Sequence, residues 1–311
     1  MDAESQTERR QVYWRPSGQL WKDDFYRNGK LDGESKRWYN NNQIRIHSFY
    51  RNGKLDGEHK SWYRNGELRQ HSFYRDGKLD GEYKQWYSDG QLQVQKFYRD
   101  GSLDGVRKTW HPDGPIWLEE SYQNGKRKGS YNEWYPNGQL CVQKFYQDSK
   151  LEGDCKTWYE NGQIQGYAFY RNGNREGERK KWYGDGQLRK RSFYLNGRLE
   201  GKLKLWHENG RLRILAFYKN GRRDGERKLW YKNGNFGARE FYHNEKTQGE
   251  MKIFHGNGTL KFYFYLQEGI PIDREFNWQK KRSILQMKKR IRRPLSTINS
   301  YIISDLLKIL Y

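Results

Sequence analysis

The sequence has few of the residues from which large globular cores are built. Leu, Ile, Val and Phe make up only 57 of its 311 residues, and 60 Lys and Arg against 38 Asp and Glu give a net charge of +22. A composition so poor in aliphatic side chains and so highly charged is typical of disordered proteins. The aromatic content argues against disorder, because the chain holds 13 Trp, 25 Tyr and 14 Phe, and they recur at a fixed spacing.

Cysteine, an apolar leader and long apolar runs are also scarce or missing. Cys141 and Cys155 are the only cysteines, too few for a disulfide framework or a Cys-only zinc site. Residues 1–10 contain no apolar stretch that would make a signal peptide. No run of about 18 apolar residues is present that would span a bilayer. We therefore expect a soluble, cytoplasmic protein that is not secreted, has no transmembrane segment and keeps its thiols reduced.

A repeat of 24 residues organises residues 13–265. Trp occurs ten times at this step, from Trp14 to Trp230, and a Phe-Tyr pair and a Gly keep the same step. Self-similarity at such a period marks a linear array of small structural units. The residues that define the repeat include Trp38, Trp62, Trp86, Trp110, Trp134, Trp158, Trp182, Trp206, Trp230, Gly33, Gly57, Gly81, Tyr50, Tyr74 and Tyr98.

Each repeat contains two turn signals separated by strand-like segments. One follows Trp-Tyr, as at Arg64-Asn65-Gly66, and the other follows Phe-Tyr, as at Arg51-Asn52-Gly53. A three-residue loop that ends in Asn-Gly or Asp-Gly is typical of a type I turn followed by a bulge, since glycine accepts the left-handed conformation. The pattern predicts one hairpin per repeat and an all-β fold, an elongated antiparallel β-hairpin array. About 22 strands spaced about 4.8 Å apart would make a rod on the order of 100 Å long.

Three-residue loops at both turns predict the strand register. Trp86 would lie opposite Leu92, Lys84 opposite Val94 and Phe97 opposite Leu103, so that even-numbered residues share one face throughout. That face would carry Trp together with the Tyr of each Phe-Tyr pair. The same register would place Cys141 directly opposite Cys155, at the spacing of cross-strand neighbours.

The two ends of the chain depart from the repeat. Residues 1–12 are expected to be flexible. Residues 266–311 read as a basic segment of two helices separated by Pro294, which would form a short α-helical C-terminal cap. Its candidate contacts with a polyanion or membrane are Lys280, Lys281, Arg282, Lys288, Lys289, Arg290, Arg292 and Arg293.

The unit from Phe73 to Leu92 resembles a MORN repeat. Its Tyr74, Gly77 and Gly81 match the tyrosine-glycine spacing of that family, and the Trp-Tyr-x-Asn-Gly-x-Leu signature resembles the variant type. About eleven copies cover residues 13–265. Long arrays of this kind are similar to the multi-repeat MORN proteins of giant double-stranded DNA viruses of the marseillevirus kind, which would place the protein in the host cytoplasm. The resemblance implies a hairpin array used for contact with proteins or phospholipids.

No catalytic constellation is apparent. Three of the seven histidines, His111, His207 and His255, occupy the place of the tyrosine that follows Trp. The recurrent glycines precede strands, whereas a phosphate-binding loop needs a helix N-terminus. We therefore expect no enzymatic activity, no cofactor or metal, and no small-molecule substrate.

Two functions remain open on the sequence alone. The first is a non-enzymatic repeat scaffold that binds an unidentified protein partner through an elongated aromatic surface. The second is a peripheral protein that binds an anionic phospholipid membrane, or another polyanion, through the basic tail and an edge of turn arginines. Nucleic acid is the less favoured polyanion, because no recognised nucleic-acid module is present.

Overall fold

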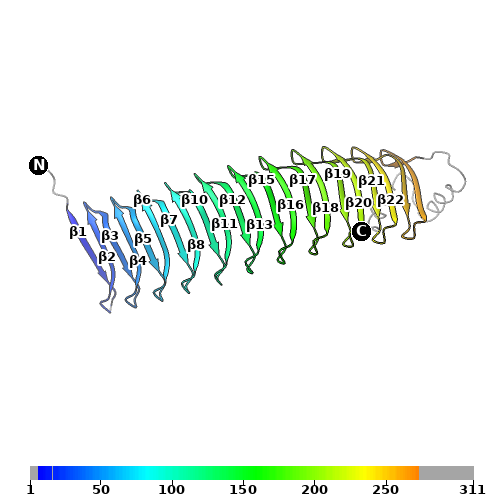
Figure 1. Cartoon of the computed structure of the whole chain (residues 1–311). Helices are drawn as coiled ribbons and strands as arrows, with labels where there is room; N and C mark the ends of the chain where they lie inside the picture. The colour runs from blue at the N-terminus through cyan, green and yellow to red at the C-terminus, as the bar shows by residue number, and fades with distance from the viewer. Residues whose placement is uncertain (1–5, 16, 273–311) are drawn as a thin grey trace, which may run out of the picture. The chain divides into compact units, whose positions relative to one another are not determined.

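A computed structural model describes residues 6–15 and 17–272 of the chain. The described residues fall into two compact units. The first comprises the residues up to 163 together with 170–173, and the second comprises 164–169 and the residues from 174 onward. The described part of the chain is made of strands without a helix, as Figure 1 shows. The prediction of an all-β hairpin array is therefore confirmed.

In the first unit, pairing is antiparallel throughout and joins strands that are next or next but one along the chain. Its strands are β1 (Thr7–Tyr13), β2 (Leu20–Arg27), β3 (Lys30–Trp38), β4 (Ile44–Arg51), β5 (Lys54–Trp62), β6 (Leu68–Arg75), β7 (Lys78–Trp86), β8 (Leu92–Arg99), β9 (Ser102–Leu103), β10 (Gly105–Trp110), β11 (Ile116–Gln123), β12 (Lys126–Trp134), β13 (Leu140–Gln147), β14 (Lys150–Leu151) and β15 (Gly153–Trp158). The next strand, β16 (Ile164–Arg171), has residues in both units.

The second unit continues the same pattern of antiparallel neighbours. Its strands are β17 (Asn174–Trp182), β18 (Leu188–Leu195), β19 (Arg198–Trp206), β20 (Leu212–Lys219), β21 (Arg222–Trp230), β22 (Phe236–His243), β23 (Lys246–Thr247), β24 (Gly249–Phe254), β25 (Leu260–Gln267) and β26 (Ile270–Pro271).

The turn after each Trp-Tyr is the predicted three-residue loop. Between β5 and β6, the Tyr63 amide donates to the Glu67 carbonyl at 2.8 Å, and the Gly66 amide donates to the Tyr63 carbonyl at 3.1 Å. Gly66 is in the left-handed region with φ of 92°, while Arg64 and Asn65 are not. One hydrogen-bonded loop of this kind per repeat sets where each Trp-bearing strand ends.

The turn after each Phe-Tyr differs from the prediction. Arg99 pairs with Ser102 and Tyr98 with Leu103, so the loop has two residues rather than three, and the predicted pairing of Phe97 with Leu103 is wrong. Asp100 and Gly101 both have positive φ, 48° and 83°, which makes this a type I′ turn. The right-handed twist of the flanking strands favours this type I′ turn over the predicted three-residue loop.

The shorter loop and a bulge beside each turn change which residues share a face. Lys84 pairs with Gln95, one residue beyond the predicted Val94, although Trp86 pairs with Leu92 as predicted. Even-numbered residues therefore do not share one face throughout the chain, and that prediction is wrong. Trp86 lies on the same face as Phe97, not on the face of Tyr98.

Two faces result, and we name them by their aromatic residues. In β5 and β6, Tyr74 and Ser72 lie opposite Gly57 and His59 on what we call the tyrosine face. The alternate residues form the phenylalanine face, where Phe73 lies opposite Glu58 and His71 opposite Lys60. The same division holds in the repeats of each unit.

The predicted contact between the two cysteines is also absent. Cys141 is the bulged residue of β13, between the pairs Trp134–Leu140 and Glu133–Val142. Val142 pairs with Thr157 on β15, which places Cys155 level with position 144, three residues along β13 from Cys141. The prediction fails because the two-residue turn shifts the register by one position, and a second bulge, between Leu151 and Thr157, shifts it by two more.

A glycine at the second bulge of the repeat permits a close approach between strands. Gly105 has φ of 127°, and a Cβ atom on it would lie 2.9 Å from the Cβ atom of Phe97. Gly33, Gly57 and Gly81 have φ of 114–115° and the same kind of contact, at 3.2–3.3 Å from the preceding Phe. At these four positions both backbone conformation and lack of room explain the periodic glycine, whereas at Gly153, Gly177, Gly201 and Gly249 only backbone conformation does.

The largest apolar cluster lies in the second unit on the tyrosine face. It contains Leu203, Ile214, Ala216, Leu229, Ala238, Met251, Ile253 and Leu266, each at most 7% exposed. In the first unit the fully buried side chains of this face are instead small or charged, such as Ser48, Ser72, Asp24 and Glu120. The tryptophans that define the repeat are half-buried at strand ends.

The ends of the array differ from the sequence prediction in extent. Residues 7–12, expected to be flexible, belong to β1, which pairs with β2. At the other end, β26 pairs with β25, although it lies beyond residue 265, where the repeat was expected to end. The predicted helical cap lies outside the described residues, apart from the part of residues 266–272 that is strand.

Candidate functional site

The phenylalanine face carries rows of ion pairs between neighbouring strands. The Glu58 carboxylate accepts from Lys60 at 2.7 Å and lies 2.8 Å from His71 Nε2. The hydrogen bond from Lys60 is the main reason that the pKa of Glu58 is lowered, with His71 adding to it. In the second unit Glu226 is held in the same way by Lys228 and Arg239, at 2.7 and 2.6 Å. The charges of this face are thus largely neutralised within it.

Phenylalanine rings lie exposed among these ion pairs. Phe97 and Phe145 in the first unit are 36% and 40% exposed, and Phe193 in the second unit is 37% exposed. Between Phe97 and Phe145 the repeat has Ser121 in place of Phe. The face therefore offers apolar rings in an electrically balanced surface.

The tyrosine face buries carboxylates that are matched by arginines. Glu120 is 1% exposed and accepts from Arg107 Nη1 at 2.7 Å and from Arg127 Nε at 2.8 Å. Glu240, also 1% exposed, accepts from Arg227 Nη1 at 2.7 Å. In both repeats the Glu follows its arginine by 13 residues, and burial of each carboxylate is tolerated because it is paired with a guanidinium.

One stretch of the tyrosine face in the second unit carries arginine and lysine without such a carboxylate. Lys181 pairs with Lys190 across β17 and β18, and Lys190 pairs with Leu205 on β19. Arg179 pairs with Ser192, which stands at the place that Glu120 and Glu240 occupy in their repeats. Ser192 is fully buried.

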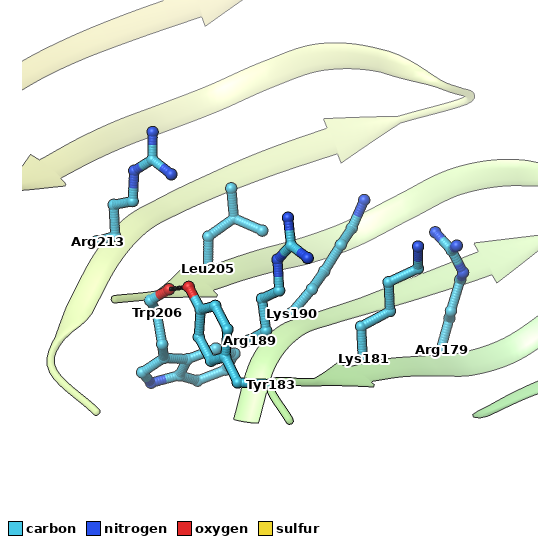
Figure 2. A pocket seen from close by; sticks show the side chains of 8 residues that line it. All are labelled: Arg179, Lys181, Tyr183, Arg189, Lys190, Leu205, Trp206 and Arg213. Carbon is cyan, nitrogen blue, oxygen red and sulfur yellow. Dashed lines mark hydrogen bonds between the residues drawn. The ribbon is translucent and has the colours of Figure 1, made fainter. Parts of the chain in front are cut away.

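These cations surround a pocket of about 200 Å³. Figure 2 shows their side chains extending to the same side of the strands. Within the part of the chain that the structure describes, no acidic residue lines the pocket. The lining residues are Arg179, Lys181, Tyr183, Arg189, Lys190, Leu205, Trp206 and Arg213.

Two contacts hold the floor of this pocket. The Tyr183 hydroxyl donates to the Trp206 carbonyl at 2.7 Å (Figure 2). The Arg189 guanidinium lies over the Tyr183 ring at 5.5 Å from its centroid, a cation–π arrangement that recurs at the same bulge in other repeats. The hydrogen bond holds the Tyr183 hydroxyl, and the cation–π contact places the Arg189 guanidinium over the Tyr183 ring.

The pocket lysines show the effect of crowded positive charge. Burial lowers the pKa of Lys190, and Arg179, Lys181 and Arg175 lower it further. Burial likewise lowers the pKa of Lys181, followed by the charges of Arg179, Arg189 and Arg175. Burial alone would raise the pKa of Tyr194, but Lys190 and Arg179 bring it below its usual value. The lowered pKa of Tyr194 shows that a negative charge is stabilised beside these cations, whereas the shifts of the two lysines arise first from burial.

Three histidines of the first unit have hydrogen-bond or ion-pair partners within the fold. His47 and His71 belong to the ion-pair rows of the phenylalanine face, and His59 Nδ1 lies 2.7 Å from the Ser48 hydroxyl. Among residues 6–15 and 17–272, no group of three or more His, Cys, Asp or Glu is placed to hold a metal ion. The predicted basic contacts from Lys280 to Arg293 lie outside the described residues.

The cationic pocket was not predicted from the sequence. The signal was present, since aligning the repeats at steps of 24 places Ser192 where Glu120 and Glu240 stand and leaves Arg179 in the position of Arg107 and Arg227. The correct register was needed to see that the two positions face each other.

Comparison with known proteins assigns the repeat. The sequence profile of the MORN repeat variant matches eight segments that together cover more than half of the chain, at residues 31–52, 55–76, 79–100, 103–124, 127–148, 151–172, 175–196 and 199–220. The chain belongs to the MORN repeat variant family. MORN repeats are a non-enzymatic type of repeat and are generally interaction or membrane-binding modules. The eight MORN matches are fewer than the eleven copies predicted from the spacing of the repeat, although hairpins of the same kind continue on both sides of the matched segments.

Other comparisons add little to the MORN assignment. No curated protein matches the sequence. The crystal structures of TcdB2-TccC3-Cdc42 and of TcdB2-TccC3 match over 86% of this chain at 12% identity, each with a TM-score of 0.20. The chain spans 15% of the length of those chains, and so low a TM-score carries no argument. No helix in the described residues is long and apolar enough to cross a membrane.

Proposed function

We propose that this MORN repeat protein is a non-enzymatic scaffold that binds a protein partner along its phenylalanine face. The observation that carries the proposal is the exposure of Phe97 and Phe145, 36% and 40%, on a face whose ion pairs are satisfied internally. Aromatic rings are enriched in the cores of protein interfaces, and charged residues are depleted there. We expect the protein to act in the cytoplasm, as multi-repeat MORN proteins of giant DNA viruses would act in the host.

The electrostatics of this face support a protein partner over a polyanion. Glu58 is shared by Lys60 and His71, so that few unneutralised cations are left beside the rings. A polyanion would have to displace these carboxylates, whereas an apolar protein surface would cover the rings and leave the ion pairs at its rim.

Site-specific photo-crosslinking tests the proposal. A benzophenone amino acid is placed at position 97, 145 or 98 of the full chain, since Tyr98 is adjacent to Phe97 but lies on the opposite face. We expect positions 97 and 145 to capture the same protein from the native source, with capture persisting at about 0.5 M salt, where exposed charge interactions are largely screened. Capture from position 98 alone, or by none of the three, would contradict the proposal.

A paired substitution supplies the control for that experiment. Phe97→Ser with Phe145→Ser uses the residue that the chain itself carries at Ser121, so the fold should be retained. We expect the double variant to lose at least about tenfold in affinity for the captured partner, about 1.4 kcal/mol. Unchanged affinity in a folded double variant would exclude these rings from the interface.

A second candidate, binding to an anionic membrane surface, has its own observation. Arg51, Arg75 and Arg99 are 71–73% exposed along one turn edge of the first unit. Each lies only 3.1–3.6 Å from an aspartate of the adjacent strand, so that their charges are partly neutralised. The basic tail would add eight cations between Lys280 and Arg293.

Vesicle sedimentation distinguishes the second candidate from the first. If the membrane is the target, neutralising Lys280, Lys281, Arg282, Lys288, Lys289 and Arg290 should abolish most binding to phosphatidylserine vesicles at about 0.15 M salt, where each near-surface charge contributes about 1 kcal/mol. Binding should also fall steeply with added salt. Equal binding by the neutralised variant would exclude the tail as the contact.

A further inference from the structure

The opposite, tyrosine face carries a second candidate site, which is independent of the proposed protein partner. The pocket between β17 and β20 has five cationic side chains in its lining and no acidic one. Repulsion among like charges destabilises such an arrangement unless a counter-charge is supplied. Two other repeats of this chain supply it from within, as Glu120 and Glu240.

We propose that this pocket binds a phosphate or diphosphate group, whose charge takes the place of the missing carboxylate. Arg179 stands where Arg107 and Arg227 stand, but faces the neutral Ser192. Lys181 and Lys190 lie directly opposite each other and beside Arg179, so three cations converge on one side of two strands.

The chemistry of the lining suits an oxyanion with more than one charge. Guanidinium groups bind phosphate with two parallel hydrogen bonds, and ammonium groups bind it as point charges. The pocket volume of about 200 Å³ far exceeds the roughly 15 Å³ that one water molecule requires on the same measure. There is accordingly room for an anion of this size above the fixed ring of Tyr183.

The pocket is partly shielded from solvent. Arg179, Lys190 and Arg213 are half-buried, although Lys181 and Arg189 are exposed. Burial is the main cause of the lowered pKa of Lys190. An ion pair formed in a partly dehydrated site is screened less by salt than one on an open surface. Binding of an anion here should consequently survive moderate salt.

The chain provides the substitution that tests the site. Ser192→Glu reproduces the arrangement of Glu120 and Glu240 and should neutralise Arg179 internally. We expect it to raise the thermal stability of the protein while weakening the binding of pyrophosphate by at least about tenfold, measured by isothermal titration calorimetry. If these cations had only a structural role, Ser192→Glu would not both raise the thermal stability and weaken pyrophosphate binding.

Ser192 is fully buried, so Ser192→Glu could misfold. Two further variants test the site independently of it. Lys190→Ile and Lys181→Leu each install the residue that the next repeat carries at the same place, Ile214 and Leu205. Both should weaken pyrophosphate binding by at least about tenfold and remain folded. Lys219→Gln, at an exposed strand end of the same unit, changes the net charge equally and should bind as the wild type does.

Several results would overturn the proposal. If folded Lys190→Ile and Lys181→Leu bind pyrophosphate as tightly as the wild type, or if Lys219→Gln loses as much, the pocket is not the binding site. Failure of the wild type to bind millimolar phosphate or pyrophosphate would also overturn it. Loss of partner capture in the crosslinking experiment would leave this result unaffected, because the residues lie on different faces.

The source of the phosphate is resolved by a third measurement. Vesicles containing phosphatidylinositol bisphosphate are tested with the wild type and the Lys190→Ile variant. Vesicle binding that is lost together with pyrophosphate binding assigns the pocket to a lipid headgroup. Vesicle binding that is equal in both proteins, with pyrophosphate binding lost, assigns it to a soluble phosphate compound.

Discussion

The Tyr63 hydroxyl donates a 2.8 Å hydrogen bond to the backbone carbonyl of Trp86, 23 residues further along the chain. The bond joins the Trp-Tyr turn of one repeat to the strand end of the next. It recurs between Tyr39 and Trp62, Tyr87 and Trp110, Tyr135 and Trp158, Tyr183 and Trp206, and Tyr231 and Phe254. The tyrosine after each tryptophan therefore holds neighbouring hairpins together, in addition to the ladder of backbone hydrogen bonds.

Removing this bond should weaken the contact between two repeats. Tyr63→Phe deletes the donor and leaves the Trp86 carbonyl without its partner, so we expect a loss of about 1 kcal/mol in the free energy of unfolding. Tyr63→His is the control, because His207 takes this place in another repeat with its Nε2 at 2.9 Å from the Trp230 carbonyl. Urea denaturation followed by tryptophan fluorescence measures both. Equal stability of the phenylalanine variant and wild type would show that the bond contributes nothing net.

The periodic glycines should differ in how much they tolerate a methyl group. Gly105→Ala would place a Cβ 2.9 Å from that of Phe97 at φ of 127°, and we expect a loss of about 3 kcal/mol or more from strain and repulsion. Gly201→Ala, at φ of 68° with nothing within 4 Å, should lose only about 1–2 kcal/mol. Denaturation midpoints of the two single variants give the comparison. A loss at Gly201 as large as that at Gly105 would rule out the steric explanation.

Stability should fall in acid where buried carboxylates are paired. Burial raises the pKa of Asp24, but the ion pairs with Arg37 and Lys22 lower it more, and the net shift is downward. Because the folded-state pKa lies below the unfolded value of about 3.9, the stabilisation is fully present above that pH and is lost as the pH falls through the folded-state pKa.

Substitution of Asp24 checks this assignment. Asp24→Asn should be less stable than wild type at pH 7, because Arg37 keeps its charge without a carboxylate, and its stability should change less between pH 5 and pH 2. Asp89→Asn is the control, since Asn65 and Asn137 occupy that turn position in other repeats. Thermal melts across this pH range would refute the assignment if the Asp24→Asn curve ran parallel to that of wild type.

The two cysteines should not form an internal disulfide. Cys141 is bulged in β13, and the pairing of Val142 with Thr157 carries Cys155 three residues away along that strand. Mild oxidation of the folded protein should therefore leave both thiols open to alkylation, as detected by mass spectrometry of peptides. A Cys141–Cys155 crosslink formed without unfolding would show that the register differs from the one described.

Several features of the fold could be read from residue spacing. The 24-residue step from Trp38 to Trp62 and onward predicted one hairpin per repeat. The loop at Arg64-Asn65-Gly66 was also predicted correctly, because glycine at its third position specifies a local conformation that needs no tertiary information. The loop at Asp100-Gly101 was assigned one residue too long. Its sequence is compatible with both lengths, and the choice depends on how the flanking strands twist against their neighbours.

The candidate site was less accessible to sequence reasoning. A single-residue change in register moves every side chain to the other face. The unpredicted bulge after Leu92 places Tyr98 on the face opposite Trp86, and the shorter turn together with a second bulge moves Cys155 away from Cys141. The bulge after Leu188 likewise concealed that Arg179 faces Ser192 and that Lys181 faces Lys190. Exposure of Phe97 and burial of Lys190 are likewise properties of packed strands.

The sequence by itself determined that this protein is an array of antiparallel hairpins, because turn conformation and the spacing of aromatic residues are local properties of the chain. Tertiary structure decided which residues share a face, because bulges and turn lengths are selected by twist and by the approach of neighbouring strands, as at Gly105 and Phe97. It also decided which charges are neutralised. Arg107 meets Glu120 while Arg179 meets Ser192, and only the pairing of strands brings residues 13 positions apart into contact.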